Sequence, residues 1–305
     1  MTKIAILIPC YNESITIKKV IEECRKYLAD ADIYVYDNNS TDGTDEIAKK
    51  AGAIVRYETK QGKGSVIRRM FREIDADCYV MIDGDLQCPL ENIKEMCQLI
   101  LNGQADMVIA DRLSESYFST NKRIFHNMGN VLVRTLVNKL FNSNIKDIMC
   151  GYRVMNRIFV KSVPILSNGF EIETEMTIHA LDKNFTIKQI PVKYKERPEG
   201  SVSKLHTFSD GFLVLKMIIS LFKDYKPFIF FTAVSLFLFL CSMVLFVPVF
   251  IEFLETSKVP RFPTLIVSGV LATMSLLMWI CGIILQTIVR KHNELYEIML
   301  KHRYR

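Results

Sequence analysis

The chain has 305 residues, of which 50% are hydrophobic and 24% are charged, and this balance excludes a disordered chain. The formal net charge is +6, but the Lys and Arg residues are dispersed, so we expect no nucleic-acid partner. An anionic membrane surface or phosphate-bearing ligands fit the charge better. The eight cysteines form no CxxC pair and have no histidine at zinc spacing, which favours reduced thiols in a reducing compartment.

Residues 3–110 alternate short apolar runs with helical patterns. We expect strands at 3–8, 33–36, 53–57, 78–82 and 107–110. The helices between them are expected at 17–28, up to Gly52, at 65–74 and from Pro89 to Leu101. This alternation predicts βαβ units and therefore an α/β fold with a mainly parallel sheet. Such a sheet binds ligands at the carboxyl ends of its strands, so the residues directly after each strand are the candidates for chemistry.

Two of these turns differ from the common nucleotide-binding motifs. The turn after the first strand, residues 9–13, reads PCYNE and lacks the GxGxxG that NAD binding requires. The turn after the third strand, KQGKGS at 60–65, resembles a P-loop, but a Walker A motif needs glycine where this chain has Tyr57. Because the loop opens a helix, its N–H groups and Lys63 are still candidates for binding a phosphate.

The turn after the fourth strand contains two carboxylates, Asp83 and Asp85, separated by one glycine. Two such charges repel each other and raise each other's pKa unless a cation lies between them. A hard divalent ion, Mg²⁺ or Mn²⁺, resolves the repulsion and also neutralises a diphosphate. A solvated β-turn is the alternative. Asp37 at the end of a neighbouring strand and the basic loop at 60–65 favour the metal site.

The C-terminal third contains two long uncharged runs, at about 227–251 and 263–289. Each exceeds the roughly 20 residues that a helix needs to cross ~30 Å of hydrocarbon, so we expect a transmembrane hairpin in preference to two buried core helices. Basic residues flank its outer ends, whereas the connecting loop balances Lys258 and Arg261 with two glutamates. The positive-inside rule then places both ends in the cytoplasm.

The sequence therefore divides into four parts. An α/β domain is expected over 1–205, an amphipathic interfacial helix over 206–226, the two spans over 227–290 and a basic cytoplasmic tail over 291–305. For the amphipathic helix, packing against the α/β domain is the alternative to lying on the membrane. The predicted location is the cell (inner) membrane, multi-pass, with the α/β domain on the cytoplasmic face.

Five motifs support a resemblance to a known family: IPCYNE, VYDNNSTDGT, MIDGDLQCP, DIMCGYRVMNR and ERPEGSVSKL. In this order they resemble family 2 glycosyltransferases with a GT-A fold. Within that family the chain is similar to the polyprenyl-phosphate glycosyltransferases, the group of dolichol-phosphate mannose synthase and the bactoprenol glucosyltransferases. The resemblance covers residues 3–205, and the C-terminal hairpin matches the bactoprenol branch.

The resemblance implies roles for the residues in these motifs. Residues that would bind the nucleotide-sugar are Pro9, Glu13, Asp37, Lys63 and Asp83. Residues that would hold the metal are Asp85, Asp83 and Gln87. Residues that would bind the acceptor phosphate are Arg112, Arg123, Arg153, Arg197, Ser203 and Lys204. Residues that would take part in catalysis are Asp85, Asp147 and Arg123, with Asp147 either orienting an arginine or acting as a base. For each arginine, a surface ion pair is the alternative.

The chain departs from the family pattern at several positions. Cys88 and Leu90 replace a histidine and a proline after the DxD pair, and Asn38 replaces an aspartate. Cys150 stands where serine is common, and Asn127 replaces a serine near the acceptor arginines. The carboxylates expected to hold the metal are intact.

The resemblance implies an inverting transfer from a nucleotide-sugar to polyprenyl (undecaprenyl) phosphate, for cell-envelope glycan modification. UDP-glucose is favoured as donor and UDP-N-acetylglucosamine comes next. A processive polysaccharide synthase of the same fold is one alternative, but the single tryptophan, Trp279, lies inside the second apolar run, so the QxxRW motif is absent. A catalytically silent membrane scaffold or sugar-nucleotide sensor is the other. The hairpin also offers a surface for a homo-oligomer.

Overall fold

A computed structural model of the chain describes residues 2–113, 124–169, 171–193, 219–220 and 222–303. The molecule forms two compact units, Met1–Gly211 and Phe212–Arg305. Most of the expected interfacial helix over 206–226 lies outside the described residues.

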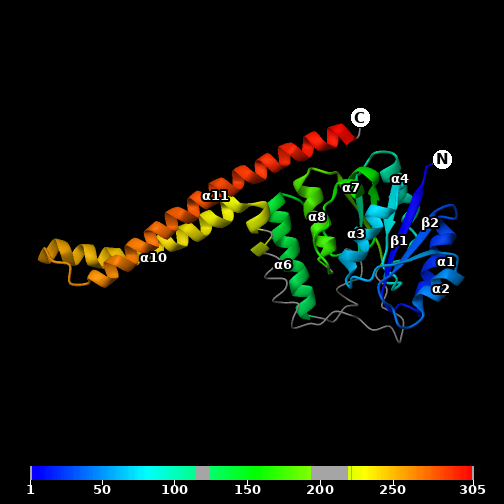
Figure 1. The fold of residues 1–305 in the computed structure, drawn as a ribbon, viewed down its shortest axis with the longest axis horizontal. Coiled ribbons are helices and arrows are strands. Elements are labelled where there is room, and N and C mark those ends of the chain that lie inside the picture. Colours follow the sequence, from blue (N-terminus) through cyan, green and yellow to red (C-terminus); the bar gives the residue numbers. More distant parts are fainter. Residues whose placement is uncertain (1, 114–123, 170, 194–218, 221, 304–305) are drawn as a thin grey trace. The chain divides into compact units, whose positions relative to one another are not determined.

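The first unit is built on a seven-stranded sheet with the strand order β3-β2-β1-β4-β6-β5-β7 (Figure 1). Its strands are β1 (Ile4–Cys10), β2 (Asp32–Asp37), β3 (Ile54–Tyr57), β4 (Cys78–Met81), β5 (Met107–Asp111), β6 (Arg153–Asn156) and β7 (Ile187–Pro191). Only β6 runs antiparallel to its neighbours. The predicted α/β fold with a mainly parallel sheet is confirmed.

The first four helices connect the parallel strands: α1 (Ile17–Tyr27), α2 (Thr44–Lys50), α3 (Lys63–Glu73) and α4 (Ile93–Leu101). Figure 1 shows α1 and α2 on one side of β1 and α3 on the other. The strand order reverses between β1 and β4, which are neighbours although β2 and β3 separate them in the chain. A crevice for ligands forms at such a switch point, outside the carboxyl ends of the strands.

The central strands are short apolar runs because helices cover the sheet on both faces. Every residue of β4 and of β5 is buried. In α1 the buried side chains are Ile17, Val20, Ile21 and Cys24, which lie on one stripe of the helix. This packing fixes the end of each strand, and with it the turn that follows.

Helix α4 begins later than the sequence pattern indicates. We expect a helix from Pro89, but α4 starts at Ile93, after Asn92 as N-cap. The residues between β4 and α4 form an irregular segment in which Leu86 has a left-handed backbone (φ 60°) and Leu90 is buried. The residues expected to form the first helical turn are therefore irregular, and Leu90 packs into the core from this segment.

The second half of the unit contains two strands that the sequence pattern misses. Strands β6 and β7 are framed by α6 (Ile124–Phe141), α7 (Arg157–Ser162) and α8 (Ile172–Asp182). β6 has the sequence RVMN and β7 the sequence IKQIP, so neither is a continuous apolar run. Pairing of β6 with β4 places the residues just before Arg153 next to the end of β4.

The second unit contains α10 (Pro227–Thr256) and α11 (Phe262–Arg303), two helices that are long and apolar enough to cross a membrane. They pack antiparallel through two serine pairs. Ser235 donates to the carbonyl of Ser275 at 2.8 Å, and Ser275 donates to the carbonyl of Ser235 at 2.9 Å. Ser242 donates to the carbonyl of Ser268 at 2.8 Å. The serines recur seven residues apart in each helix, so both pairs lie on one seam.

The helices are longer than the apolar runs from which they were predicted. α10 extends to Thr256, beyond the expected end at 251, and a left-handed Ser257 ends it. α11 continues through the predicted basic tail to Arg303 without a break.

Candidate active site

The turn after β4 places Asp83 and Asp85 at the switch point. Asp85 is 6% exposed, and its Oδ1 accepts the N–H of Gln87 at 3.2 Å. The left-handed backbone of Leu86 makes this tight turn, a conformation that is unfavourable for leucine and is often found at functional sites. Thr16 precedes α1, and its hydroxyl donates to the carbonyl of Gly84 at 2.5 Å, so this hydrogen bond fixes the turn to the start of α1.

Gly151 approaches this turn closely from the segment before β6. A Cβ at Gly151 would lie 2.2 Å from Oδ2 of Asp83. Only glycine fits there without displacing the carboxylate. The antiparallel pairing of β4 and β6 thus brings the DIMCGYR motif to the Asp83–Asp85 turn.

Lys63 lies between two carboxylates. Its Nζ is 2.5 Å from Oδ1 of Asp83 and 2.5 Å from Oε1 of Glu173, and the exposed fractions of the Lys63 and Glu173 side chains are 10% and 4%. Burial lowers the pKa of Lys63, but the charges of Asp83 and Glu173 outweigh this effect and raise the pKa overall. The ammonium is therefore charged at neutral pH.

Several backbone N–H groups of the loop at 60–65 donate hydrogen bonds to other groups of the protein. Gly62 donates to Oδ1 of Asn38 at 2.7 Å, and Gly64 donates to the carbonyl of Asn168 at 3.0 Å. The side-chain amide of Asn38 also donates to the carbonyls of Glu58 and Lys60. A carboxylate could not donate these two bonds, so asparagine at position 38 suits a loop-holding role.

Asp37 ends β2 opposite Cys10 of β1. It is 3% exposed, and its Oδ1 accepts the N–H of Ser40 at 2.9 Å. Within the described residues, its Oδ2 is buried with no hydrogen-bond partner. Such an atom is costly unless a ligand satisfies it. Pro9 lies near the end of β1, Glu13 lies in the turn that follows, and the Glu13 side chain lies beside Gly84.

Asp147 and Arg112 form a buried, two-pronged ion pair. Nε of Arg112 is 2.8 Å from Oδ2 of Asp147, and its NH2 is 3.2 Å from Oδ1. Burial lowers the pKa of Arg112, but the Asp147 charge raises it well above its ordinary value. Of the two roles left open for Asp147, this contact favours orientation of an arginine.

Arg153 has a position that differs from its predicted use. Its side chain is 0% exposed, and it donates to the carbonyls of Ile148 and Cys150 and to the hydroxyl of Thr177. In this structure the guanidinium is therefore not accessible to an acceptor phosphate. It instead ties the segment that carries Asp147 to helix α8.

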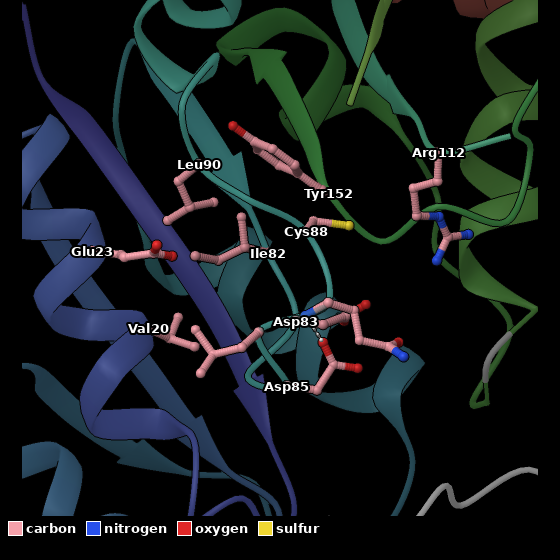
Figure 2. Close-up of a pocket in the computed structure, with 11 residues that line it drawn as sticks. Val20, Glu23, Ile82, Asp83, Asp85, Cys88, Leu90, Arg112 and Tyr152 are labelled. Atoms are coloured by element: carbon pink, nitrogen blue, oxygen red, sulfur yellow. Dashed lines mark hydrogen bonds between the residues drawn. The ribbon is translucent and has the colours of Figure 1, made fainter. Parts of the chain in front are cut away.

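A pocket opens beside the Asp83–Asp85 turn, and Arg112 also lines it. Its lining consists of Val20, Glu23, Ile82, Asp83, Asp85, Leu86, Gln87, Cys88, Leu90, Arg112 and Tyr152. Figure 2 shows Cys88 between the two aspartates and Tyr152, with Arg112 on a separate segment across from them. Four further predicted residues lie outside the described residues: Arg123, Arg197, Ser203 and Lys204.

The donor set at the turn fits Mg²⁺ or Mn²⁺. Among the described residues no group of three His, Cys, Asp or Glu side chains is arranged to hold a metal alone. Mg²⁺ is commonly held by one or two carboxylates, with substrate phosphates and water completing the shell. Asp85, with Asp83 and Gln87 beside it, supplies such a partial set.

The sequence pattern did not reveal two of the structural residues at this site. Glu173 lies in the acidic first turn of α8, where such residues normally act on the helix dipole. Thr16 precedes α1 as an ordinary cap. No local pattern marks Glu173, because its partner Lys63 is 110 residues away in the chain.

The fold and the site together define a GT-A glycosyltransferase: a switch-point crevice that contains a DxD turn. The chain matches the model of Glycosyl transferase family 2 over residues 5–163 and belongs to that family. It is 31% identical over 233 residues to glycosyltransferase AglJ of Haloferax volcanii, covering 76% of each chain.

Other similarities agree with this assignment. The chain is 26% identical over 216 residues to a dolichyl-phosphate hexose transferase of Haloferax volcanii, covering 71% of this chain and 92% of that protein. Among solved structures, glucosyl-3-phosphoglycerate synthase from Mycobacterium tuberculosis matches with a TM-score of 0.58 at 22% identity, covering 73% of this chain and 80% of that one. The latter similarity shows the fold alone.

Proposed function

We propose that the protein transfers a sugar from a nucleotide-sugar, UDP-glucose first and UDP-N-acetylglucosamine next, to polyprenyl phosphate with inversion at C1. The observation that carries the proposal is the DxD turn in one pocket with a partly buried, charged Arg112, in a chain that also has an apolar helical hairpin. The names of relatives that act on dolichyl phosphate support a lipid phosphate as acceptor.

On the donor side, Asp37 would accept a hydrogen bond from a nucleoside hydroxyl or N–H, and its buried Oδ2, which has no hydrogen-bond partner among the described residues, supports this role. Pro9 and Glu13, at and just after the end of β1, remain predicted to bind the same nucleotide-sugar. Asp85, with Asp83 and Gln87, would hold Mg²⁺ or Mn²⁺, which when bound would stabilise the charge of the leaving diphosphate. The structure of the mycobacterial relative in complex with Mn²⁺ and UDP supports this choice of ion and nucleotide.

On the acceptor side, a lipid phosphate is already mostly ionised near neutral pH, since its second pKa is about 6. Its oxygen can therefore attack C1 without a strong base, while the bond from C1 to the diphosphate oxygen breaks. Arg112, held in place by Asp147, would bind the phosphate. Arg123, Arg197, Ser203 and Lys204 remain predicted partners of the same phosphate.

The hairpin supports a membrane-bound enzyme whose acceptor is already in the bilayer. Both helices exceed the roughly 20 residues required to span. We propose that the two ends and the catalytic unit are cytoplasmic, as the distribution of basic residues predicts. The two spans and the absence of a QxxRW motif in the sequence speak against a processive synthase.

The test is transfer by the purified full-length protein. Wild type is incubated with undecaprenyl phosphate and radiolabelled UDP-glucose, UDP-N-acetylglucosamine or GDP-mannose, and lipid-extractable label is counted. Asp85→Asn should reduce transfer by at least a hundredfold with an unchanged melting temperature, because it removes a charge and little packing. Asp75→Asn is the matched control, since Asp75 is an exposed aspartate paired with Arg157.

Chelation with EDTA should abolish transfer, and Mg²⁺ or Mn²⁺ should restore it. Full activity under chelation would contradict the proposed metal dependence. Hydrolysis of the nucleotide-sugar without any lipid-linked product would contradict the proposed polyprenyl-phosphate acceptor. Binding of nucleotide-sugar with neither reaction would favour the silent sensor.

A further inference from the structure

The strongest unexplained feature of the site is the lysine that lies between a DxD carboxylate and a glutamate on another element. Lys63 comes from the first residue of α3, Asp83 from the turn after β4 and Glu173 from the first turn of α8. We infer that Lys63 is an internal counter-cation that sets the charge of the Asp83–Asp85 turn, and that Glu173 is the positioning residue that holds it there. The inference rests on the proposed metal and donor site.

Burial makes this arrangement hard to open. The Lys63 and Glu173 side chains are 10% and 4% exposed. To reach a diphosphate, the ammonium would have to leave both carboxylates. Glu173 would then keep a buried charge without the ion pair that compensates it, a loss of several kcal/mol for a buried pair. We therefore revise the expectation that Lys63 binds the nucleotide phosphates.

The backbone around Lys63 is fixed as well. A Cβ at Gly62 would lie 2.1 Å from the carbonyl oxygen of Asn168, and one at Gly64 would lie 2.3 Å from that of Ser167. Arg68 of α3 donates to the carbonyls of Ile165 and Ser167. The start of α3 is thus seated on the segment that leads into α8, so Lys63 and Glu173 are held by the same contact surface.

The consequence is electrostatic. Asp83, Lys63 and Glu173 together have a charge of −1. Without the Glu173 charge, the Lys63–Asp83 pair is neutral, and the turn attracts a divalent cation less strongly. Without both Lys63 and Glu173 charges, Asp83 again contributes −1. Removal of the Glu173 charge should therefore weaken metal binding, and removal of the Lys63 charge as well should restore it. A residue that served only to stabilise the fold would not produce this reversal.

The test is Mn²⁺ uptake by the full-length protein in detergent, with and without UDP, followed by the electron paramagnetic resonance signal of free Mn²⁺. Glu173→Gln should weaken Mn²⁺ binding roughly ten- to a hundredfold, as expected when a partly buried site that binds a divalent ion loses one unit of nearby negative charge. Lys63→Met combined with Glu173→Gln should return the Kd to within about threefold of wild type.

Two further variants separate charge from folding. Glu173→Asp keeps the charge and should bind Mn²⁺ more tightly than Glu173→Gln. Glu175→Gln removes a carboxylate of the same helix that accepts hydrogen bonds from Leu166 and Ser167, so Mn²⁺ binding should be unchanged. If Glu173→Gln does not fold, Lys63→Met alone decides the sign: it changes the local charge from −1 to −2 and should bind Mn²⁺ more tightly than wild type, and weaker binding would overturn the inference.

The outcomes are distinct. Unchanged Mn²⁺ binding in Glu173→Gln, or a double variant as weak as the single one, overturns the inference. A double variant that binds Mn²⁺ normally but loses UDP affinity tenfold in the absence of metal would make Lys63 a diphosphate ligand after all. Wild type that takes up no Mn²⁺ even with UDP would remove the proposed metal site itself. If wild type takes up Mn²⁺ and Glu173→Gln binds it equally well, the inference about Lys63 and Glu173 is wrong, but the proposed metal site stands.

Discussion

The contact between Gly151 and Asp83 gives a sharp test of how the active site is assembled. In Gly151→Ala the new methyl carbon would lie 2.2 Å from Oδ2 and 2.8 Å from Cγ of Asp83. Ordinary contact requires roughly 3.4 Å, so the carboxylate must retreat by about 1 Å. Lys63 and Gly84 surround it, so this movement disturbs the whole turn. A misplacement of about 1 Å can reduce the rate of an enzyme about a hundredfold.

The expected result is a kcat/KM for lipid-linked sugar formation lowered about a hundredfold, with a loss of stability of roughly 1–3 kcal/mol from overpacking. Transfer is measured with undecaprenyl phosphate, and stability by thermal unfolding in the same detergent. Gly269→Ala serves as control, because nothing lies within 4 Å of a Cβ at that position.

A double-mutant cycle shows whether Asp83 is the cause. In an Asp83→Ala background the carboxylate is absent, so Gly151→Ala should change the unfolding free energy by no more than about 0.5 kcal/mol. The reasoning is refuted if Gly151→Ala retains wild-type transfer. It is equally refuted if the substitution destabilises the Asp83→Ala protein as much as the wild type.

Two further predictions concern the hairpin and the sheet edge. Ser235→Ala removes a hydroxyl bonded to Ser275 and should destabilise the hairpin by about 0.6–1.7 kcal/mol in bilayer unfolding, whereas Thr273→Ala, whose hydroxyl bonds only within its own helix, should be neutral. Burial raises the pKa of Glu73, but hydrogen bonds led by that of Arg69 lower it to about 2. The resulting stability is present above about pH 4.5 and is lost as the pH falls toward 2. In Glu73→Gln the loss of unfolding free energy between pH 4.5 and 2 should therefore be smaller than in wild type by about 1–2 kcal/mol after solvent screening. An equal loss in both proteins would contradict this.

Sequence reasoning was most reliable where one physical constraint dominates. Strands β1, β2, β4 and β5 are largely buried apolar runs because both faces of the sheet are covered there, and each of the first five strands lies within one or two residues of its predicted bounds. The same pattern predicts the positions of Asp37 and Asp83, because the carboxyl ends of the parallel strands β2 and β4 lie at the same edge of the sheet. A tight pair of carboxylates at that edge is unusual enough to indicate chemistry on its own.

Sequence reasoning was less reliable where contacts between residues far apart in the chain determine the structure. Strands β6 and β7 are half polar, and their pairing partners cannot be read from a local pattern. Arg153 matches a family motif, yet its location inside β6 directs the guanidinium toward backbone carbonyls. The partnership of Lys63 with Glu173 joins residues 110 apart in the sequence, and no periodicity reports such a contact.

The departures from the family pattern are accounted for by their partners in space. Cys88, where the family usually has histidine, forms a hydrogen bond with Cys150, where serine is common, and this bond together with burial raises the pKa of Cys88 well above its ordinary value. The thiol is therefore neutral beside Asp83. A histidine there could become protonated and add a positive charge next to the DxD turn. With a neutral thiol in its place, Arg112 is the cation among the described residues that line the pocket, and Lys63 lies behind Asp83; each is paired with a buried carboxylate, Asp147 and Glu173 respectively.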